Sequence, residues 1–144
     1  MKVLLDTNVL LDILEKREPY FSDSYKIFIK SAERKIEAII GAGSVTDIYY
    51  VTRKNCKDAE QALDFIIDML KIVTPVDTKA VDIQTAIKLN FSDFEDAVIA
   101  ATATRENADY IISRNADDFI KSPVPAITPT EFLKKHSEFG DYFL

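Results

Sequence analysis

Short apolar runs alternate with longer amphipathic stretches in the first part of this chain. Residues 3–5 form an apolar run that ends at Asp6, and apolar residues then recur at the spacing of a helix. A second amphipathic helix is predicted over about 22–34, and residues 38–40 form the next apolar run, followed by two closely spaced glycines. The pattern predicts a strand, two helices and a second strand.

The same alternation continues to the end of the chain. The predicted elements are a helix over 44–53 capped by Ser44, a helix around 62–70, a strand at 72–73 closed by Pro75, helices over 77–88 and 93–107, and a strand at 110–113. A last short strand and helix are expected between and after the prolines at 123, 125 and 129.

Strands that alternate with helices are typical of an α/β fold. We expect a mostly parallel sheet covered on both faces, a three-layer α/β/α arrangement connected by right-handed crossovers. The chain has 144 residues and shows no repeat or interdomain linker, so residues 1–144 are expected to form a single domain. In such sheets, ligands bind at the carboxyl ends of the strands.

Composition narrows the possible chemistry. The single cysteine, Cys56, excludes an internal disulfide and a Cys-based zinc site, and the single histidine, His136, argues against a catalytic His triad. No apolar run approaches the length of a membrane span, so we expect a cytoplasmic protein without a membrane segment. The net charge of −6 argues against a uniformly basic surface for nucleic acid. Carboxylates are the remaining candidates for catalysis.

Acidic residues follow several predicted strands. Asp6 comes directly after the first strand, and Asp47 lies near the start of the helix that follows the second strand. The helix after Phe91 begins with Ser92, Asp93, Phe94, Glu95 and Asp96. Each acid has a structural alternative as a helix cap, and Ser92 with Glu95 is a capping box. Asp96 fits that alternative least well, because it begins a nearly all-apolar stretch.

A fourth polar segment follows the strand at 110–113. Asn115 offers a neutral oxygen ligand, whereas Asp117 or Asp118 can cap the short helix that begins near Phe119. If the four segments converge on one sheet edge, their like charges require a divalent cation or a basic partner. Hard oxygen ligands suit Mg²⁺ or Mn²⁺ better than zinc.

The sequence around these acids resembles the PIN-domain family of nucleases, particularly the toxins of toxin–antitoxin modules. The resemblance covers nearly the whole chain and is carried by residues 3–12, residues 93–103, and residues 108–115 with the Asp118-Phe119 pair. It implies that Asp6, Asp47 and Asp96 bind the metal ion. Many family members have Glu at the position of Asp47 and Asp at the position of Asn115, so both residues depart from the family pattern.

The resemblance also implies roles for neighbouring residues. Asp93 is expected to bind or position metal-bound water, and Asn115 to orient water or phosphate. Thr7 and Asn8 resemble the polar pair that orients the first acid through hydrogen bonds. Candidate contacts to the RNA backbone are Arg53, Lys54, Lys57, Arg105 and Arg114.

The resemblance implies a metal-dependent endoribonuclease with an antitoxin protein as partner and a homodimer as the assembly. The apolar tail, with Phe132, Leu133, Phe139, Tyr142, Phe143 and Leu144, can pack on a neighbour or on its own domain. Two alternatives remain open. One is a PIN-fold module that binds RNA or protein with little or no catalysis. The other is a receiver-like phosphoryl-transfer domain, although that class expects paired acids after the first strand, where this chain has Asp6 and Thr7.

Overall fold

Five parallel strands form the centre of the computed structural model, which describes residues 1–137. The strand order is β3-β2-β1-β4-β5, with β1 in the middle. The strands are β1 (Lys2–Leu5), β2 (Glu37–Gly41), β3 (Thr74–Val76), β4 (Tyr110–Ile112) and β5 (Ala126–Ile127). The helices are α1 (Thr7–Leu14), α2 (Phe21–Ala32), α3 (Ala42–Asn55), α4 (Ala59–Leu70), α5 (Ala80–Leu89), α6 (Phe94–Arg105), α7 (Pro129–Lys135) and the 3-10 helix η1 (Ala116–Phe119).

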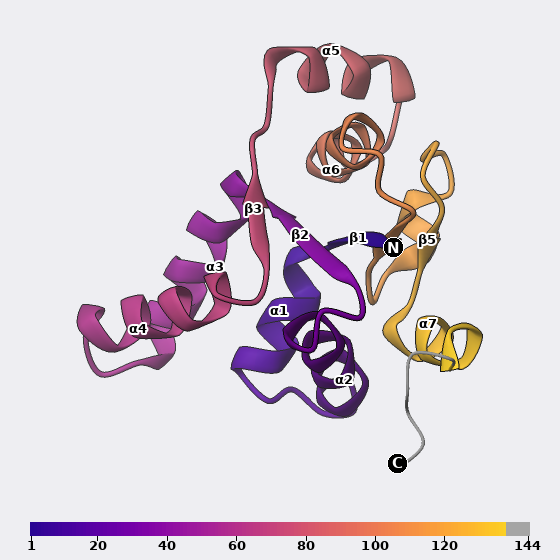
Figure 1. Cartoon of the computed structure of the whole chain (residues 1–144). Coiled ribbons are helices and arrows are strands. Elements are labelled where there is room, and N and C mark those ends of the chain that lie inside the picture. Colours follow the sequence, from indigo (N-terminus) through magenta and orange to yellow (C-terminus); the bar gives the residue numbers. More distant parts are fainter. Residues whose placement is uncertain (138–144) are drawn as a thin grey trace.

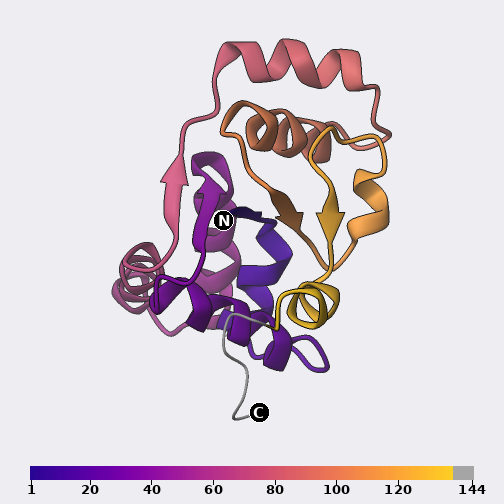
Figure 2. The same ribbon diagram turned by 45° about the vertical axis from the view of Figure 1, so that its right-hand side comes forward.

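Helices cover both faces of the sheet, which confirms the predicted three-layer α/β/α fold. Helices α5 and α6 lie on one side, whereas α1, α2 and α7 lie on the other, with α3 and α4 beside them (Figure 1). A view turned by 45° shows the same division (Figure 2). The sheet is entirely parallel, which is a stricter arrangement than the mostly parallel sheet expected from the sequence.

Alternate residues of the central strand face the two layers. Val3 and Leu5 of β1 belong to the larger core with α1, α2, α3, α4 and α7, whereas Leu4 belongs to the core under α6. A strand buried on both faces reads as an unbroken apolar run, because neither face meets water. This is why residues 3–5 carry no polar alternation.

Three predicted element boundaries are wrong. The third strand is Thr74–Val76 rather than 72–73, and Pro75 lies inside it. Proline is tolerated there because β3 is an edge strand. Helix α3 begins at Ala42 after the N-cap Gly41, so Ser44 lies inside the helix instead of capping it. Helix α6 is capped by Asp93 rather than Ser92.

Strand register brings the first and fourth strands together at the carboxyl edge. Leu5 pairs with Ile112, and the backbone N–H of Asp6 donates to the carbonyl of Ile112 at 2.9 Å. Asp6 and Ser113 therefore leave the sheet side by side. The carboxyl ends of β1, β2 and β4 face the same edge, which is the edge where the predicted site lies.

The C-terminal helix packs on its own domain. Phe132 is fully buried in the larger core, and Leu133 packs against that core. The predicted contacts of Phe139, Tyr142, Phe143 and Leu144 lie outside the described residues. Within residues 1–137, no helix has the length and apolar character that crossing a membrane requires.

Candidate active site

Asp6 is the most buried carboxylate at the carboxyl edge of the sheet, with an exposed fraction of 7%. It is also the N-cap of α1, because its Oδ1 accepts the backbone N–H of Thr7 at 2.8 Å. Burial raises the pKa of Asp6; hydrogen bonds lower it, and the negative charges of Asp118 and Asp93 raise it further. Net, the pKa lies above its ordinary value. Asp6 therefore caps α1 and also belongs to the group of acids at this sheet edge.

Ser113 is a site residue that the sequence interpretation missed. Its hydroxyl is fully buried, donates to Asp6 Oδ2 at 2.8 Å and accepts the backbone N–H of Asn115 at 3.0 Å. This hydrogen bond fixes the orientation of Asp6 and lowers its pKa. The only signal in the sequence is that Ser113 follows an apolar strand, which is too common to identify it.

Thr7 and Asn8, which were expected to orient Asp6 through hydrogen bonds, differ in what they contact. Thr7 contacts Asp6 through its backbone N–H, while its hydroxyl is buried without a hydrogen-bond partner among residues 1–137. The side-chain oxygen of Asn8 accepts the backbone N–H of Arg114 at 3.4 Å. Asn8 therefore joins α1 to the turn after β4, and Ser113 provides the side-chain hydrogen bond to Asp6 that was expected from this pair.

Asp96 is the most strongly perturbed acid in this group. Its pKa is raised from 3.8 to about 7 by burial and by the charges of Asp6, Asp93, Asp118 and Glu95. Asp93 caps α6 by accepting the backbone N–H of Asp96 at 3.1 Å, which places the two carboxylates at the same helix end. The charges of Asp6 and Asp93 thus act on Asp96, and the three acids form one electrostatic cluster.

Asp118, for which the sequence left helix capping open, also acts on these acids. Its charge raises the pKa of both Asp6 and Asp96, so it belongs to the acidic cluster rather than only to a helix start. Asn115 is the N-cap residue of η1 but makes no side-chain capping bond, and its side chain is exposed. Asp117 is also exposed.

Asp47 lies at the margin of the cluster. It is exposed on α3, and its charge acts on Glu95, whose pKa is raised by burial and then by Asp47, Asp93 and Asp6. Asp47 and Glu95 also line a cavity of about 780 Å³ that opens beside the cluster. Because α3 begins at Ala42, Asp47 lies more than one turn inside the helix rather than in its first turn.

The carboxylate and hydroxyl oxygens of this cluster are the type of ligand that a hard divalent cation prefers. The buried hydroxyl of Thr7, beside Asp6, has no protein partner, and the acids around Asp96 repel one another. A bound cation relieves that repulsion, and carboxylates are the ligands that Mg²⁺ and Mn²⁺ prefer. Within residues 1–137, however, no three Asp, Glu, His or Cys side chains are arranged to hold an ion together. Mg²⁺ keeps several waters when it binds, so one or two direct carboxylates are sufficient.

Two of the predicted RNA contacts, Arg105 and Arg114, have ion-pair partners within the fold. Arg105 binds Asp82 at 2.9 Å on the far part of α6. Arg114 lies 3.2 Å from Asp12 and 4.3 Å over the ring of Tyr20. Asp12 is completely buried, so its charge needs such a partner. Arg53, Lys54 and Lys57 lie at the C-terminal end of α3 and just beyond it.

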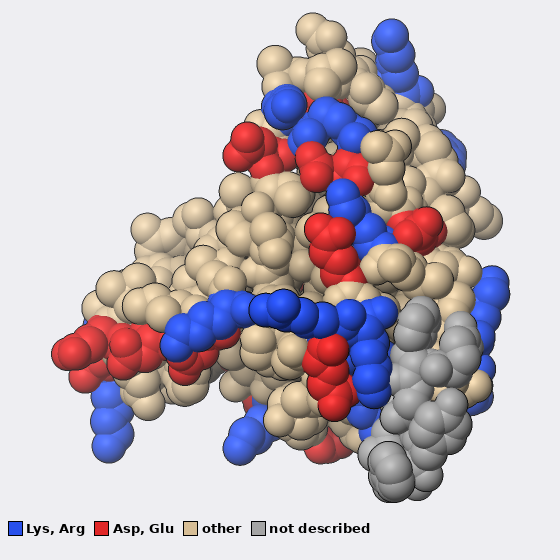
Figure 3. Space-filling view, in the orientation of Figure 1, with Lys and Arg blue, Asp and Glu red and all other residues tan. Residues whose placement is uncertain are grey.

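Basic residues gather at the opposite edge of the sheet. Arg34, Lys35 and Lys71 line a hollow at the amino ends of the strands, together with Met1 and Glu37. On the face drawn in Figure 3, Lys and Arg form a band across the lower part of the molecule. The carboxyl edge, by contrast, collects the acids Asp6, Asp93 and Asp96.

The sequence model of the PIN domain matches residues 2–117. The chain belongs to the PIN domain family. This excludes the receiver-like alternative and confirms the resemblance seen in the sequence.

Known relatives of this PIN domain agree in length and fold. "Ribonuclease VapC1" from Aquifex aeolicus (strain VF5) is 27% identical over 139 residues, which cover 93% of this chain and 94% of that protein. VapBC-1 from nontypeable Haemophilus influenzae has a TM-score of 0.67 at 17% identity, covering 90% of this chain and 99% of the other. VapC20 from Mycobacterium tuberculosis, described as a sarcin-ricin loop cleaving toxin, has a TM-score of 0.62 at 12% identity, covering 81% and 92%.

Proposed function

We propose that this PIN domain is an endoribonuclease that uses Mg²⁺ or Mn²⁺ and acts as the toxin of a toxin–antitoxin pair. The observation that carries the proposal is the raised pKa of Asp96, about 7, in a cluster with Asp6, Asp93 and Asp118. Repulsion among clustered carboxylates destabilises a fold, whereas the same carboxylates attract and bind a cation. The similarity to a ribonuclease along 93% of this chain supports RNA as the substrate.

Asp6 and Asp96 would hold the ion directly, and Asp93 and Asp118 would bind through its waters. When bound, the ion polarises the phosphate and activates water for phosphodiester hydrolysis. Ser113 keeps the carboxylate of Asp6 oriented through its 2.8 Å hydrogen bond. Asn115 is assigned to orienting water or phosphate, and Asp47 to the outer part of the site, where it faces Glu95.

An antitoxin protein is proposed as the partner that restrains this activity in the cytoplasm. Solved structures with this fold include the toxin–antitoxin complexes VapBC-1 from Haemophilus influenzae and a complex from Klebsiella pneumoniae. The net charge of −6 favours a partner segment that carries Arg or Lys. A homodimer is proposed as the assembly, and sedimentation of the purified protein tests it.

RNA hydrolysis by the purified protein tests the central proposal. We expect cleavage of a mixed RNA panel with Mg²⁺ or Mn²⁺, loss with EDTA, and 5′-phosphate ends, since metal-activated water needs no 2′-hydroxyl nucleophile. Asp96→Asn should abolish cleavage, and the exposed Asp117→Asn should retain most of it. A 2′,3′-cyclic phosphate product, or equal losses in both variants, would show that the mechanism is wrong.

The second candidate is a PIN-fold module with little or no catalysis. It is favoured by Asp47, which has a short side chain at the margin of the cluster, and by the neutral Asn115. The same assay separates the two candidates. RNA binding by wild-type protein with no cleavage in either metal supports the binding module.

A further inference from the structure

A cavity of about 780 Å³ opens beside the acidic cluster, between α6 and the start of α3. Its apolar part is formed by Leu4, Val98 and Ile99, and Phe94 lines it with half of its surface exposed. Asp47 and Glu95 lie on its wall, and the charges of Asp93 and Asp6 act on Glu95. The cavity is therefore contiguous with the proposed hydrolysis site.

The far wall of the cavity adds a cation. Residues 77–79, between β3 and α5, line it, and Lys79 is exposed there. Among residues 1–137, Lys79 forms no ion pair, whereas Arg105 and Arg114 are paired with Asp82 and Asp12. The cavity thus combines an apolar floor, an exposed aromatic ring and a positive charge, next to acids that are proposed to hold a cation.

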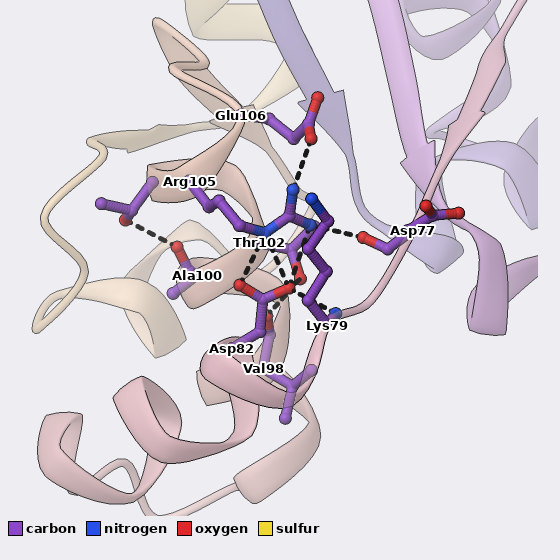
Figure 4. A network of polar contacts seen from close by, with 9 residues as sticks. Asp77, Lys79, Asp82, Val98, Ala100, Thr102, Arg105 and Glu106 are labelled. Atoms are coloured by element: carbon purple, nitrogen blue, oxygen red, sulfur yellow. Dashed lines mark hydrogen bonds and ion pairs between the residues drawn. The ribbon is translucent and has the colours of Figure 1, made fainter.

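A buried ion pair keeps this wall in place. Figure 4 shows the guanidinium of Arg105 among Asp82, Glu106 and the backbone of Asp77. Arg105 Nε binds Asp82 at 2.9 Å, and Arg105 also donates to the Asp77 carbonyl. The other oxygen of Asp82 accepts the backbone N–H of Lys79 at 2.9 Å. Asp82 is 1% exposed, and this network joins the segment at 77–79 to α6.

We infer that this cavity is a subsite for one unpaired nucleotide of the RNA, with Phe94 stacking on its base and Lys79 binding its phosphate. The inference rests on the proposed ribonuclease function and names the substrate class as single-stranded or looped RNA. A base can stack on Phe94 only after it leaves its own helix, because a paired base has both faces covered. Stacking tolerates every base, so the subsite selects unpaired structure more than sequence.

Binding of a short fluorescent RNA tests the subsite without requiring hydrolysis. Ca²⁺ replaces Mg²⁺ in the assay, since it also takes oxygen ligands. Phe94→Ala is expected to raise the Kd by about 5- to 100-fold, as loss of one base–aromatic stack does, and Phe94→Tyr should stay near wild type. Lys79→Met should weaken binding less and reduce its salt dependence.

Two controls and a blocking variant sharpen the test. Ile87→Ala removes an apolar side chain from α5 that is 65% exposed, against 50% for Phe94. Lys71→Met removes a cation from the opposite sheet edge. Both variants should bind RNA as wild type does. Gly43 lines the cavity, and a Cβ there would meet no atom within 4 Å. Gly43→Leu should therefore fold normally and still weaken RNA binding.

Base removal identifies the nucleotide that is held. An RNA series with one abasic nucleotide at each position should contain one position, close to the cleaved bond, where wild type loses affinity. Phe94→Ala should lose nothing further there, because both changes remove the same stack. Duplex RNA of the same sequence should bind all variants alike.

The outcomes separate this inference from the proposed function. Wild-type affinity in both Phe94→Ala and Gly43→Leu overturns the subsite, whether or not wild type cleaves RNA. Weakened binding in both variants without any cleavage by wild type supports the subsite and overturns the ribonuclease. Unchanged RNA binding together with weakened binding of a protein partner assigns the cavity to a protein interface, which also overturns the inference.

Discussion

Ser113, directly after β4, donates a hydrogen bond of 2.8 Å to Asp6, directly after β1, although the two residues are 107 positions apart in the sequence. The bond is buried, and it forms because Leu5 and Ile112 are paired in the sheet. The position of the proposed site is therefore a consequence of strand register. A slip between β1 and β4 would separate the carboxylate from the group that orients it.

Ser113→Ala should weaken the site without unfolding the protein. The substitution removes the bond to Asp6 and leaves the backbone N–H of Asn115 without its acceptor. We expect about a 10- to 100-fold loss in Mg²⁺ affinity or cleavage, the usual effect of removing a partner of a metal ligand. Calorimetric Mg²⁺ titration and the cleavage rate measure it.

Ser122→Ala is the matched control for this variant. Its hydroxyl accepts only the backbone N–H of Val124 in a loop after η1. It should cost a similar part of the folding free energy, about 1 kcal/mol, with cleavage unchanged. If both serine variants lose the same cleavage, the effect of Ser113 is on stability alone.

Asp118 and Asp117 are adjacent acids with different expected effects. The charge of Asp118 raises the pKa of Asp6 and Asp96, and Asp117 is its exposed neighbour in η1. Asp118→Asn should lower the pKa of Asp96 and reduce cleavage severalfold, whereas Asp117→Asn should change neither. NMR titration of the side-chain carboxyl carbons measures the pKa directly. An unchanged Asp96 pKa in Asp118→Asn would remove Asp118 from the cluster.

Local sequence patterns predicted the central part of this fold well. The apolar run at 3–5 predicts β1, because a strand buried on both faces reads as an unbroken apolar run. Asp6 follows that run and is therefore placed at the carboxyl edge of the sheet. Asp96 stood out because a carboxylate beside an apolar helix face is rarely left without a partner. Both inferences depend only on neighbouring residues.

The missed residues depend on tertiary contacts. Ser113 matters only because β4 pairs with β1, and Asp118 only because η1 brings it toward Asp96. Asp47 lies inside a helix that begins at Ala42, two residues before Ser44, with glycine as its N-cap. Glycine is an acceptable N-cap but a weak sequence signal next to serine.

The Arg105–Asp82 pair should contribute strongly to stability. Burial raises the pKa of Asp82, but hydrogen bonds from Arg105, the Lys79 backbone and Thr102 lower it more, so the net pKa lies below 3.8. Arg105→Met leaves this 1%-exposed carboxylate unpaired and should cost about 3 kcal/mol in urea unfolding at neutral pH. Lys71→Met breaks an exposed pair with Asp68 and should cost less than about 0.5 kcal/mol.

The pH dependence of this pair has a definite sign. Because the folded pKa of Asp82 is lowered, its contribution is present above about pH 4 and is lost as the pH falls through the folded value. The difference in unfolding free energy between wild type and Asp82→Asn should therefore shrink in acid. A difference that is constant from neutral pH to about pH 3 would show that the charge on Asp82 is not what stabilises α5 on α6.

Asp96 should make the metal-free protein less stable as the pH rises. Its pKa is 3.8 before perturbation and about 7 in the folded protein, so between these values the unfolded chain loses its proton first. The free energy of unfolding therefore has its full contribution from the protonated Asp96 below about pH 4. This contribution is lost progressively as the pH rises to about 7. In EDTA, the Tm of Asp96→Asn should therefore exceed that of wild type by an amount that grows between about pH 4 and about pH 7. At higher pH the difference in Tm should stay constant.

Mg²⁺ should reverse this effect, because the cation replaces the proton as the group that neutralises the cluster. Affinity for Mg²⁺ should rise about tenfold per pH unit up to about pH 7, where Asp96 is ionised, and then level off.

At a Mg²⁺ concentration of about ten times the Kd, binding stabilises wild type by about 1.4 kcal/mol, whereas Asp96→Asn should gain much less. Thermal melts with and without Mg²⁺ at about pH 5 and about pH 8 measure both effects, with Asp117→Asn as the control. If wild type and Asp96→Asn melt alike at both pH values, with no Mg²⁺ shift in either, the acids at this sheet edge serve only as helix caps.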